Sequence, residues 1–340
     1  MPAYTTGNGM KWIGLLVLFS AQAALGGAAF VDFDLGLIFP QKLGGMACDR
    51  VENYSNEEMG YSVFYSLGGG ITAEVSVLDL GRRDIGTGYK ADGVDVILQA
   101  LEVQLERREK LKEIAKWKKR GSTVIPRNGD VQFANNVYQY AEPREDAGIA
   151  GTVTRILSVY VTAAHNHFIR VDLLFDIGDN TTARKITEAL VPQMVTLIQA
   201  GHSEQELLLA GCDALVYNPS DYAGRLAARR ILEKTQTMAD LAIYDAFFVW
   251  SEQSEWERPK NFELLEAAYY AGMLKAVLPQ NLSEGGDQEA FVAMLEAYAA
   301  MRKRDDIKAI PQLEEWVKAP DKKALYKKLL IEFEYVLPSD

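Results

Sequence analysis

The fold of this chain is decided by residues 60–80, which read GYSVFYSLGGGITAEVSVLDL. Two runs rich in β-branched and aromatic residues, 60–67 and 71–80, flank three consecutive glycines at 68–70. Alternating runs of this kind are typical of β-strands, and glycine at the connection is typical of a tight hairpin. The stretch therefore predicts two antiparallel strands joined by a short turn.

Further strands are expected downstream of this hairpin. A second hairpin is predicted around a turn at 127–130, and a third follows it along the chain. A polar loop, EPREDAGIAG, is expected between them at 142–151. The strands of these two hairpins are STVIP (122–126), VQFANNVYQYAE (131–142), Val153–Val161 and Phe168–Phe175.

Two helices are expected to accompany these strands. The first runs roughly from Val94 to Lys119. The second runs from about Thr182 to Ala200, and Pro192 inside it is expected to kink it. The apolar stripe of the first helix recurs at helical spacing, at Val94, Ile97, Leu98, Leu101, Leu105, Leu111 and Ala115.

The element order over residues 30–200 is therefore strands, helix, four strands and helix, with hairpin connections. Because hairpins join antiparallel neighbours, this order predicts an antiparallel sheet flanked by helices, an α+β sandwich. No G-x-G-x-x-G motif follows a strand, and no Walker lysine motif is present, which argues against a parallel nucleotide-binding sheet.

Residues 201–340 are expected to form an all-α helical domain. They contain 6 glycines, against 16 in residues 30–200. Residues 218–221, Asn-Pro-Ser-Asp, are typical of a helix start, with a capping side chain followed by proline. LEAAYYA (265–271) and LEAYAAM (295–301) are alike, which leaves stacked helical hairpins or a compact bundle open. Helices are expected at 221–237, 239–252, 261–277, 288–304, 310–318 and 321–336.

The N-terminus has the pattern of a secretory signal peptide over residues 1–29. Lys11 precedes the apolar run WIGLLVLF at 12–19, and small residues with an A-x-A site follow. This pattern predicts export to the periplasm or the extracellular space. The alternative is an uncleaved anchor, and only that form would contact the membrane. The expected cleavage points are Ala23 and Ala29, and the more natural start is Met10.

Composition narrows the classes of partner. The net charge of −11, from 36 basic and 47 acidic residues, argues against a nucleic-acid partner. Two cysteines and three histidines exclude zinc ribbons and disulfide scaffolds, and nothing indicates a cofactor. In an oxidising compartment Cys48 and Cys212 can pair and clip the two domains together. The alternative is two buried thiols that act as small apolar side chains.

Arg82, Arg83 and Asp84 form a candidate ligand site in a glycine-bearing loop, 81–92, ahead of the first helix. The two guanidinium groups are suited to phosphate or carboxylate, close to free N–H groups at a helix start. The alternative, which we prefer, is a surface loop whose arginines pair with Asp84 or Asp92.

His165 and His167 form a candidate metal site, because positions i and i+2 of a strand share a face. No third ligand is evident in the sequence. Asn166 between them is typical of a turn, so we favour a solvated hairpin turn.

Two further clusters have ordinary structural explanations. The basic run from Lys116 to Arg120 is a positive patch at the expected end of the first helix, where a solvated helix face is the usual explanation. Acids near aromatic residues in the helical half are suited to a glycosidase-like acid–base pair. The helical spacing of the aromatic residues indicates a core stripe instead. The acids are Asp213, Asp221, Asp240 and Asp245.

Short phrases follow one another along the first domain: FPQKLGGMACDRVENYS (39–55), GYSVFYSL, VSVLDLG, a long charged helix and HFIRVDLLF (167–175). In this order they resemble the PsbP/Mog1-type α/β/α sandwich, and exported bacterial members in particular, over about residues 35–200. Members of that fold act as binding or accessory subunits, in photosynthetic complexes or with a GTPase. The resemblance therefore implies a non-enzymatic role. No functional motif of either group is present, so no site residue is carried over.

Two functional hypotheses follow. The first is an exported, non-enzymatic accessory protein that binds an envelope protein or a small ligand. The alternative is a periplasmic hydrolase with its site between the two domains. A membrane-anchored scaffold is a third possibility, which depends on an uncleaved signal. The hydrolase would use Asp213, Asp240 or Asp245 together with Arg82 or Arg83.

Overall fold

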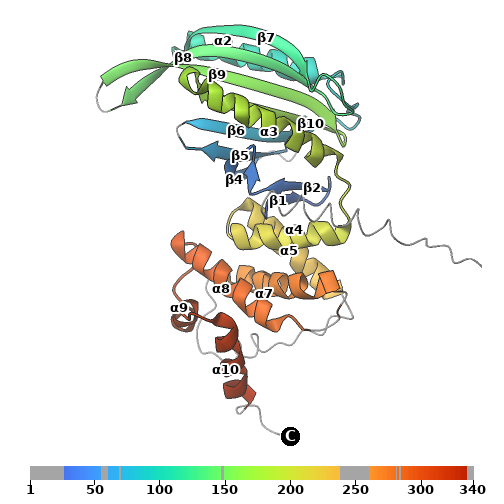
Figure 1. Ribbon diagram of the computed structural model, residues 1–340, viewed down its shortest axis with the longest axis vertical. Coiled ribbons are helices and arrows are strands. Elements are labelled where there is room, and N and C mark those ends of the chain that lie inside the picture. Colours follow the sequence, from blue (N-terminus) through green and yellow to red (C-terminus); the bar gives the residue numbers. More distant parts are fainter. Residues whose placement is uncertain are drawn as a thin grey trace, which may run out of the picture. The chain divides into compact units, whose positions relative to one another are not determined.

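The computed structural model describes residues 27–54, 60–68, 70–146, 149–237, 260–280, 282 and 285–334. Two compact units make up the chain (Figure 1). The first contains the segment Pro40–Ala200. The second combines Ala28–Phe39 with the segment from Gly201 onward. The α+β class expected from the sequence is confirmed.

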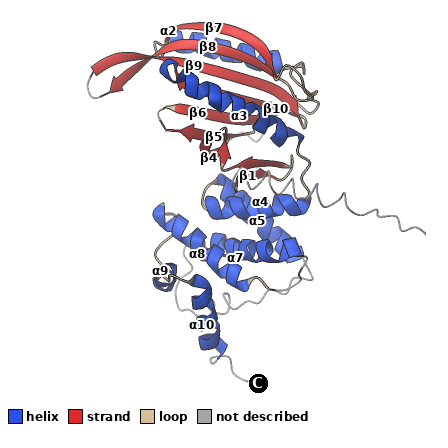
Figure 2. Ribbon diagram, in the orientation of Figure 1, coloured by secondary structure: helices blue, strands red, loops and turns tan. Residues whose placement is uncertain are grey.

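The first unit is built on one eight-stranded sheet in which every neighbouring pair is antiparallel (Figure 2). The strand order is β3-β4-β5-β6-β10-β9-β8-β7. Each half of the sheet follows the chain by hairpins, and the pairing of β6 with β10 joins the halves. The strands are β3 (Lys42–Leu43), β4 (Met46–Asn53), β5 (Tyr61–Leu67), β6 (Ile71–Leu78), β7 (Ala115–Ile125), β8 (Phe133–Asp146), β9 (Ile149–Ala164) and β10 (His167–Asp176).

The three expected hairpins are confirmed. β5 and β6 pair from Leu67↔Ile71 outward, across the glycine turn. β9 and β10 are joined by His165 and Asn166, which have positive φ angles of 51° and 60°. Two consecutive left-handed residues define a type I′ turn, whose twist matches that of the strands.

The prediction of a polar loop at 142–151 is wrong, because strands β8 and β9 extend through most of this segment. β8 runs to Asp146 and β9 starts at Ile149, and the ladder continues to the pair Asp146↔Ile149. Proline and charged residues hide the alternation there, whereas backbone hydrogen bonding across the pair does not depend on side-chain polarity.

The first helix, α2 (Val94–Lys110), ends nine residues before the expected Lys119. The chain turns at 111–114, where Lys112 has a φ of 61°, and then forms β7 at the edge of the sheet. Lysine and arginine are good helix formers, but intrinsic helix propensity is small, and tertiary pairing with β8 overrides it. Leu111 is consequently 59% exposed, while Ile114 lies in the core.

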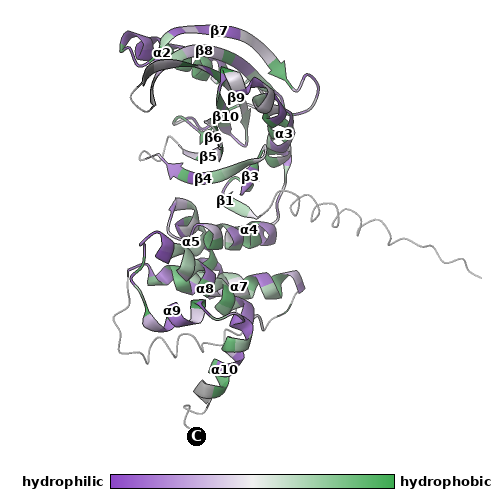
Figure 3. Ribbon diagram, turned by 60° about the vertical axis from the view of Figure 1, so that its left-hand side comes forward, coloured by the Kyte–Doolittle hydropathy of each residue, from purple (hydrophilic) through white to green (hydrophobic). Residues whose placement is uncertain are grey.

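The basic run from Lys116 to Arg120 therefore lies on an edge strand and not at a helix end. Hydrophilic residues follow much of β7 (Figure 3), and register shifts interrupt its pairing with β8 twice. Charged side chains and irregular pairing on an edge strand oppose the addition of further strands.

A helix covers each face of the sheet. α2 packs on one face, against Leu157, Val159 and Val161 of β9. The second helix, α3 (Asn180–Gln199), packs on the other face, where Met194 lies close to Tyr160. α3 follows the 3-10 turn η2 (Ile177–Asp179), and Pro192 lies inside it as expected.

The second unit contains a β-hairpin and a set of helices. The helices expected at 221–237, 261–277, 288–304, 310–318 and 321–336 are all present to within a few residues, and the one at 239–252 lies outside the described residues. The elements are β1 (Ala28–Asp32), β2 (Leu37–Pro40), α4 (Glu204–Tyr217), α5 (Tyr222–Thr237), α7 (Phe262–Val277), η3 (Leu278–Gln280), α8 (Asp287–Lys303), α9 (Pro311–Val317) and α10 (Lys322–Glu334).

Two helix starts differ from the sequence analysis. α4 was not expected as a separate helix, although Ser203 and Glu206 form a complete capping box ahead of it. α5 starts at Tyr222, one residue after the expected 221, but its capping residue differs from the expected Asn218. The Asp221 carboxylate, and not the Asn218 side chain, accepts the hydrogen bond from the Gly224 N–H at 2.9 Å.

The hairpin of β1 and β2 belongs to the helical unit, whereas the sequence analysis placed residues 30–39 in the sandwich and took 201–340 as all-α. The Phe30 ring lies 5.7 Å from Phe39 and 6.0 Å from Tyr222 of α5. Phe33 packs over Gly211 of α4, where a side chain would have no space. A two-stranded hairpin cannot bury its apolar residues alone, so it needs these helices.

We expect Phe30→Ala to destabilise the second unit by about 3–4 kcal/mol, because a fully buried aromatic side chain and two ring contacts are lost. Hydrogen exchange read by mass spectrometry should show faster exchange in α4 and α5, with the strands β5 and β6 unchanged. Asp34→Asn is the control, because Asp34 is exposed and a surface ion pair contributes less than about 1 kcal/mol. Faster exchange confined to the sheet would contradict the assignment of the hairpin.

Candidate functional site

The first unit contains a cavity of about 440 Å³ between α2 and the sheet. This volume falls within the range of about 300–1,000 Å³ that is typical of small-molecule sites. Its lining combines charged, polar and apolar side chains from six strands and the helix. The lining residues are Asp49, Arg50, Phe64, Tyr65, Thr72, Ala73, Glu74, Leu101, Gln104, Leu105, Arg108, Tyr140, Leu157, Arg170, Asp172 and Leu174.

Strand register explains why the charged residues meet. Asp172 of β10 lies directly opposite Glu74 of β6, and Arg170 lies opposite Ser76. Ser76 in turn pairs with Ser62 of β5. Because alternate residues of a strand share a face, all five side chains lie on the face that α2 covers only in part.

The sheet changes character across this face. On the β9 side, Val159 and Val161 lie opposite Asp172 and Arg170 and pack under α2. On the β6 side, Glu74 lies opposite Asp172 and Ser76 lies opposite Arg170, so the positions across the sheet are polar there. The site is therefore the border where an apolar, helix-covered half of the sheet meets a polar half.

Arg170 and Asp172 form a two-point ion pair. The Arg170 Nε donates to Asp172 Oδ1 at 2.7 Å, and Nη2 donates to Oδ2. The two side chains are only 20% and 17% exposed. Burial raises the pKa of Asp172, and the Arg170 guanidinium opposes that rise. Burial lowers the pKa of Arg170, but the Asp172 carboxylate outweighs it and the pKa is raised overall.

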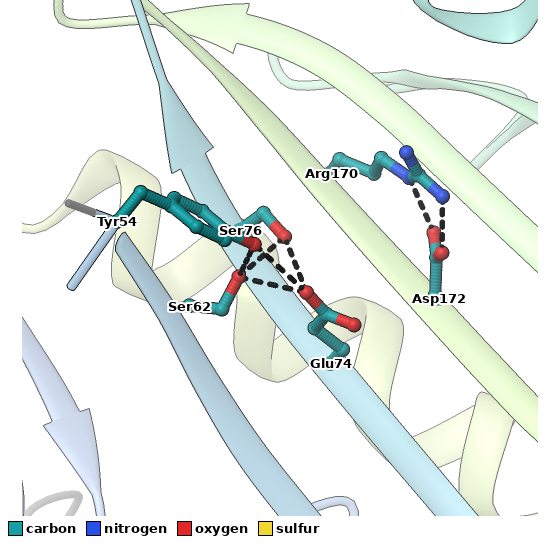
Figure 4. A network of polar contacts seen from close by, with 6 residues as sticks. All are labelled: Tyr54, Ser62, Glu74, Ser76, Arg170 and Asp172. Carbon is teal, nitrogen blue, oxygen red and sulfur yellow. Dashed lines mark hydrogen bonds and ion pairs between the residues drawn. The ribbon is translucent and has the colours of Figure 1, made fainter. Parts of the chain in front are cut away.

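Glu74 is the centre of a second network, shown beside the ion pair in Figure 4. Its Oε1 accepts hydrogen bonds from Ser62 Oγ at 2.8 Å and from Ser76 Oγ and Tyr54 OH at 3.2 Å each. The three hydroxyls also contact one another: Ser62 lies 2.6 Å from Tyr54 and 2.8 Å from Ser76. The hydroxyls thus hold one carboxylate oxygen in place.

The helix side of the cavity is held by Arg108 near the end of α2. Its guanidinium binds the carboxylates of Glu142 and Glu113 at 3.3 Å each and lies 5.7 Å from the centre of the Tyr140 ring. Arg155 of β9 also binds Glu142, at 3.1 Å. These ion pairs connect α2 to strands β8 and β9 beside the cavity.

The lining suits binding of a ligand that has polar and apolar parts. Its charged residues comprise three arginines and three acids, and Leu101, Leu105 and Leu157 supply a buried apolar wall. It includes no histidine or cysteine. Ser62 is fully buried, and its hydroxyl is bonded to Glu74. An activated nucleophile requires a base within reach and access to substrate, and the buried hydroxyls of Ser62 and Ser76 lack that access.

The loop candidates Arg82, Arg83 and Asp84 do not converge on this cavity. Arg82 Nη1 donates to the Asp92 carbonyl oxygen at 2.9 Å, so its partner is backbone and not the expected carboxylate of Asp84 or Asp92. Asn166 clamps the loop, because its amide donates to the Arg83 carbonyl at 2.7 Å and accepts from the Ile85 N–H at 2.6 Å. The loop has a structural role in holding the β9–β10 turn.

His165 and His167 lie in the hairpin turn, as favoured by the sequence. The His165 Nε2 lies 2.7 Å from the Ile198 carbonyl oxygen, and the His167 Nδ1 lies 2.9 Å from the carbonyl of His165. Across the described parts of the chain, no group of three histidine, cysteine or acidic side chains is placed to hold a metal ion.

The two cysteines lie in different units, Cys48 in β4 and Cys212 in α4, and each is buried. Burial raises the pKa of the Cys212 thiol well above its ordinary range, which disfavours a nucleophilic thiolate. Burial is compatible with the role of small apolar side chains. A bridge between the cysteines stays a prediction.

The remaining candidates do not form a site in the described chain. Asp213 binds Lys275 Nζ at 2.5 Å on the surface of the helical unit. Asp221 is the helix cap described above, and burial raises its pKa. Asp240, Asp245 and the cleavage point Ala23 lie outside the described residues.

Sequence reasoning missed the residues that line the cavity. Polar residues at alternate positions, Thr72, Glu74 and Ser76 on β6 and Arg170 and Asp172 on β10, were a usable signal. Such a pattern on a central strand indicates that one face is not fully covered by the core. The sequence alone could not show that these strands are neighbours.

No protein-family model matches the sequence, and a comparison with curated proteins finds no significant match. None of the helices in the described segments is long and apolar enough to span a membrane.

We expect Arg170→Met to destabilise the first unit by about 2–3 kcal/mol at neutral pH, because it leaves the Asp172 carboxylate buried without its partner. The loss in free energy of unfolding should become smaller as the pH falls. The pKa of Asp172 is already raised by burial, and without Arg170 it rises further, so acidic pH protonates the carboxylate and removes the cost.

Denaturant unfolding of wild type and variant between pH 4 and pH 7.5 measures this difference. Arg184→Met is the matched control, because Arg184 is 81% exposed and pairs with Glu188 of the same helix, α3. Equal losses at both ends of the pH range would show that Asp172 is not the group responsible.

Proposed function

We propose that the protein is an exported, non-enzymatic accessory protein that binds a small ligand in the cavity of its first unit. The cavity is the observation that carries the proposal, because its size and its mixed polar and apolar lining are those of a binding site. Arg82, Arg83 and Asp213, which were predicted to act in a hydrolase, are not among its lining residues.

Export is supported by the sequence of the N-terminal segment, in which Lys11, an apolar run and an A-x-A site follow one another. We propose the periplasm or the extracellular space as the location. The resemblance to PsbP/Mog1-type proteins also favours an accessory role, and an antiparallel sheet with a helix on each face is compatible with it. A protein of the envelope is the partner we propose for the helical unit.

We expect the mature protein to begin at Ala24, after cleavage at Ala23. Ala28 and Ala29 lie in β1 with exposures of 5% and 0%, so cleavage at Ala29 would remove buried residues of the hairpin. N-terminal sequencing of protein recovered from the envelope checks this. A mature chain beginning at Phe30 would contradict it, and an unprocessed chain in the membrane fraction would support the anchor.

The hydrolase alternative gains no support from the described residues. Asp213 is bonded to Lys275, and Arg82 is bonded to the Asp92 carbonyl. Asp240 and Asp245 lie outside the described residues. No observation favours an acid–base pair, so we do not propose one.

Native mass spectrometry of the full chain, purified from its own envelope fraction, tests ligand binding. We expect a small molecule to be retained by wild type and lost in Gln104→Trp, because Gln104 is exposed at the cavity and an indole would fill the space. Gln99→Trp is the matched control on an exposed position of α2 outside the lining.

Retention of the same molecule by both tryptophan variants would place the ligand elsewhere. Absence of any retained molecule in wild type, together with no binding from a small-molecule screen, would contradict the proposal. Chemical cross-linking in the native envelope tests the partner separately, and we expect one abundant protein to be captured reproducibly.

A further inference from the structure

We infer that the cavity binds a zwitterionic small molecule with an apolar side chain, of the class of free amino acids and short peptides. This inference rests on the proposed function, since it names the ligand of that same cavity. It depends on three features of the lining: an arginine edge that is still available, a carboxylate oxygen that is still available, and an adjoining leucine wall.

The first feature is the Arg170 guanidinium. Its Nε and Nη2 bind Asp172, which uses one edge of the group. A guanidinium has five N–H donors in a planar fork, so the edge that carries Nη1 can bind a second carboxylate. Figure 4 shows this edge directed away from Asp172, and Arg170 lines the cavity.

The second feature is the Glu74 carboxylate. All three hydroxyl contacts among the described residues go to Oε1. Oε2 points away from the hydroxyls in Figure 4. An ionised carboxylate accepts at both oxygens, so Oε2 is suited to an ammonium group.

The spacing of these two groups fits one ligand headgroup. Glu74 lies opposite Asp172, so Arg170 is its diagonal neighbour on the next strand. Diagonal neighbours across an antiparallel pair have Cα atoms about 7–8 Å apart, within reach of long side chains. The ammonium and the carboxylate of an α-amino acid are attached to the same carbon, so one molecule can bridge Glu74 and Arg170.

The charge balance disfavours simple ions. The lining holds Arg50, Arg108 and Arg170 against Asp49, Glu74 and Asp172, so its formal charge is zero. An anion at Arg170 would lie beside two carboxylates, and a cation at Glu74 would lie beside a guanidinium. A zwitterion meets opposite charge at both ends.

The third feature is the leucine wall, which indicates that the part of the ligand beyond its charged groups is apolar. Leu101 and Leu105 of α2 and Leu157 of β9 line the cavity and are less than 10% exposed. Leu174 completes this wall. An apolar side chain that reaches it removes hydrocarbon surface from water, and a cavity of about 440 Å³ has space for such a group beside the headgroup.

The test is calorimetric titration of the full mature chain with L-leucine, L-phenylalanine and leucyl-leucine. Two blocked probes accompany them: N-acetyl-L-leucine, which lacks the ammonium, and L-leucinamide, which lacks the carboxylate. We expect at least one free probe to bind, and both blocked forms to bind at least about tenfold more weakly, because each loses a charged hydrogen bond. Blocked forms that bind as well as the free ones would overturn the inference.

Glu74→Gln should weaken binding of the free probe at least about tenfold, and it should leave L-leucinamide no better bound than N-acetyl-L-leucine. Glu188→Gln on the exposed surface of α3 is the control and should bind as wild type does. Unchanged circular dichroism in both variants separates loss of binding from loss of folding. Wild-type affinity in Glu74→Gln would also overturn the inference.

The outcomes of these experiments distinguish failure of the zwitterion inference from failure of the proposed ligand-binding function. If a retained envelope molecule is lost in Gln104→Trp but none of the free probes binds, the zwitterion is wrong and the ligand-binding function stands. If neither a retained molecule nor any probe binds, both fail.

Discussion

The pairing of β6 with β10 is the contact on which the first unit depends. These strands are adjacent in the sheet, although about 90 residues of chain separate them, and seven residue pairs from Phe168↔Leu78 to Leu174↔Thr72 define their register. All other neighbours in the sheet are hairpin partners. A slip by one residue would turn Arg170 and Asp172 to the opposite face, where α3 packs on apolar side chains. The buried ion pair and the packing of both helices therefore enforce a single register.

The same pairing creates a site by bringing together polar residues that hairpins alone would keep apart. Glu74 is held by the hydroxyls of its own half of the sheet, and Asp172 by Arg170 on its own strand. Charges removed from water need such partners, and each of these groups has at least one. One edge of the Arg170 guanidinium and one oxygen of the Glu74 carboxylate are then available to a ligand, beside the leucine wall of the cavity. The ligand-binding function and the zwitterion proposal both follow from this incomplete pairing.

The second unit depends on close approach of backbones. At Gly224 and Gly272 an added Cβ would lie 2.0 Å from the Asn218 carbonyl oxygen and 2.4 Å from that of Glu289. Gly211 likewise receives the Phe33 ring of the N-terminal hairpin. The contact at Gly211, together with packing of Ala28 and Val31 on Leu207 and Ala210, joins the hairpin to α4, so the chain contributes to the second unit both before and after the first. The two units are therefore connected through two chain segments.

The sequence by itself determined the α+β class, the three hairpins, α3 and most of the helices after residue 220, because period-2 and period-3.6 patterns and turn residues are local signals. Local patterns predicted the wrong end for α2, where pairing of the edge strand β7 with β8 overrides helix propensity, and a loop at 142–151, where β8 pairs with β9 despite its charged residues and proline. Only the tertiary structure decided that the residues 28–39 join the helical unit and that Glu74 faces Asp172. Both depend on contacts between distant segments, and a single sequence has no local signal for which distant strands become neighbours.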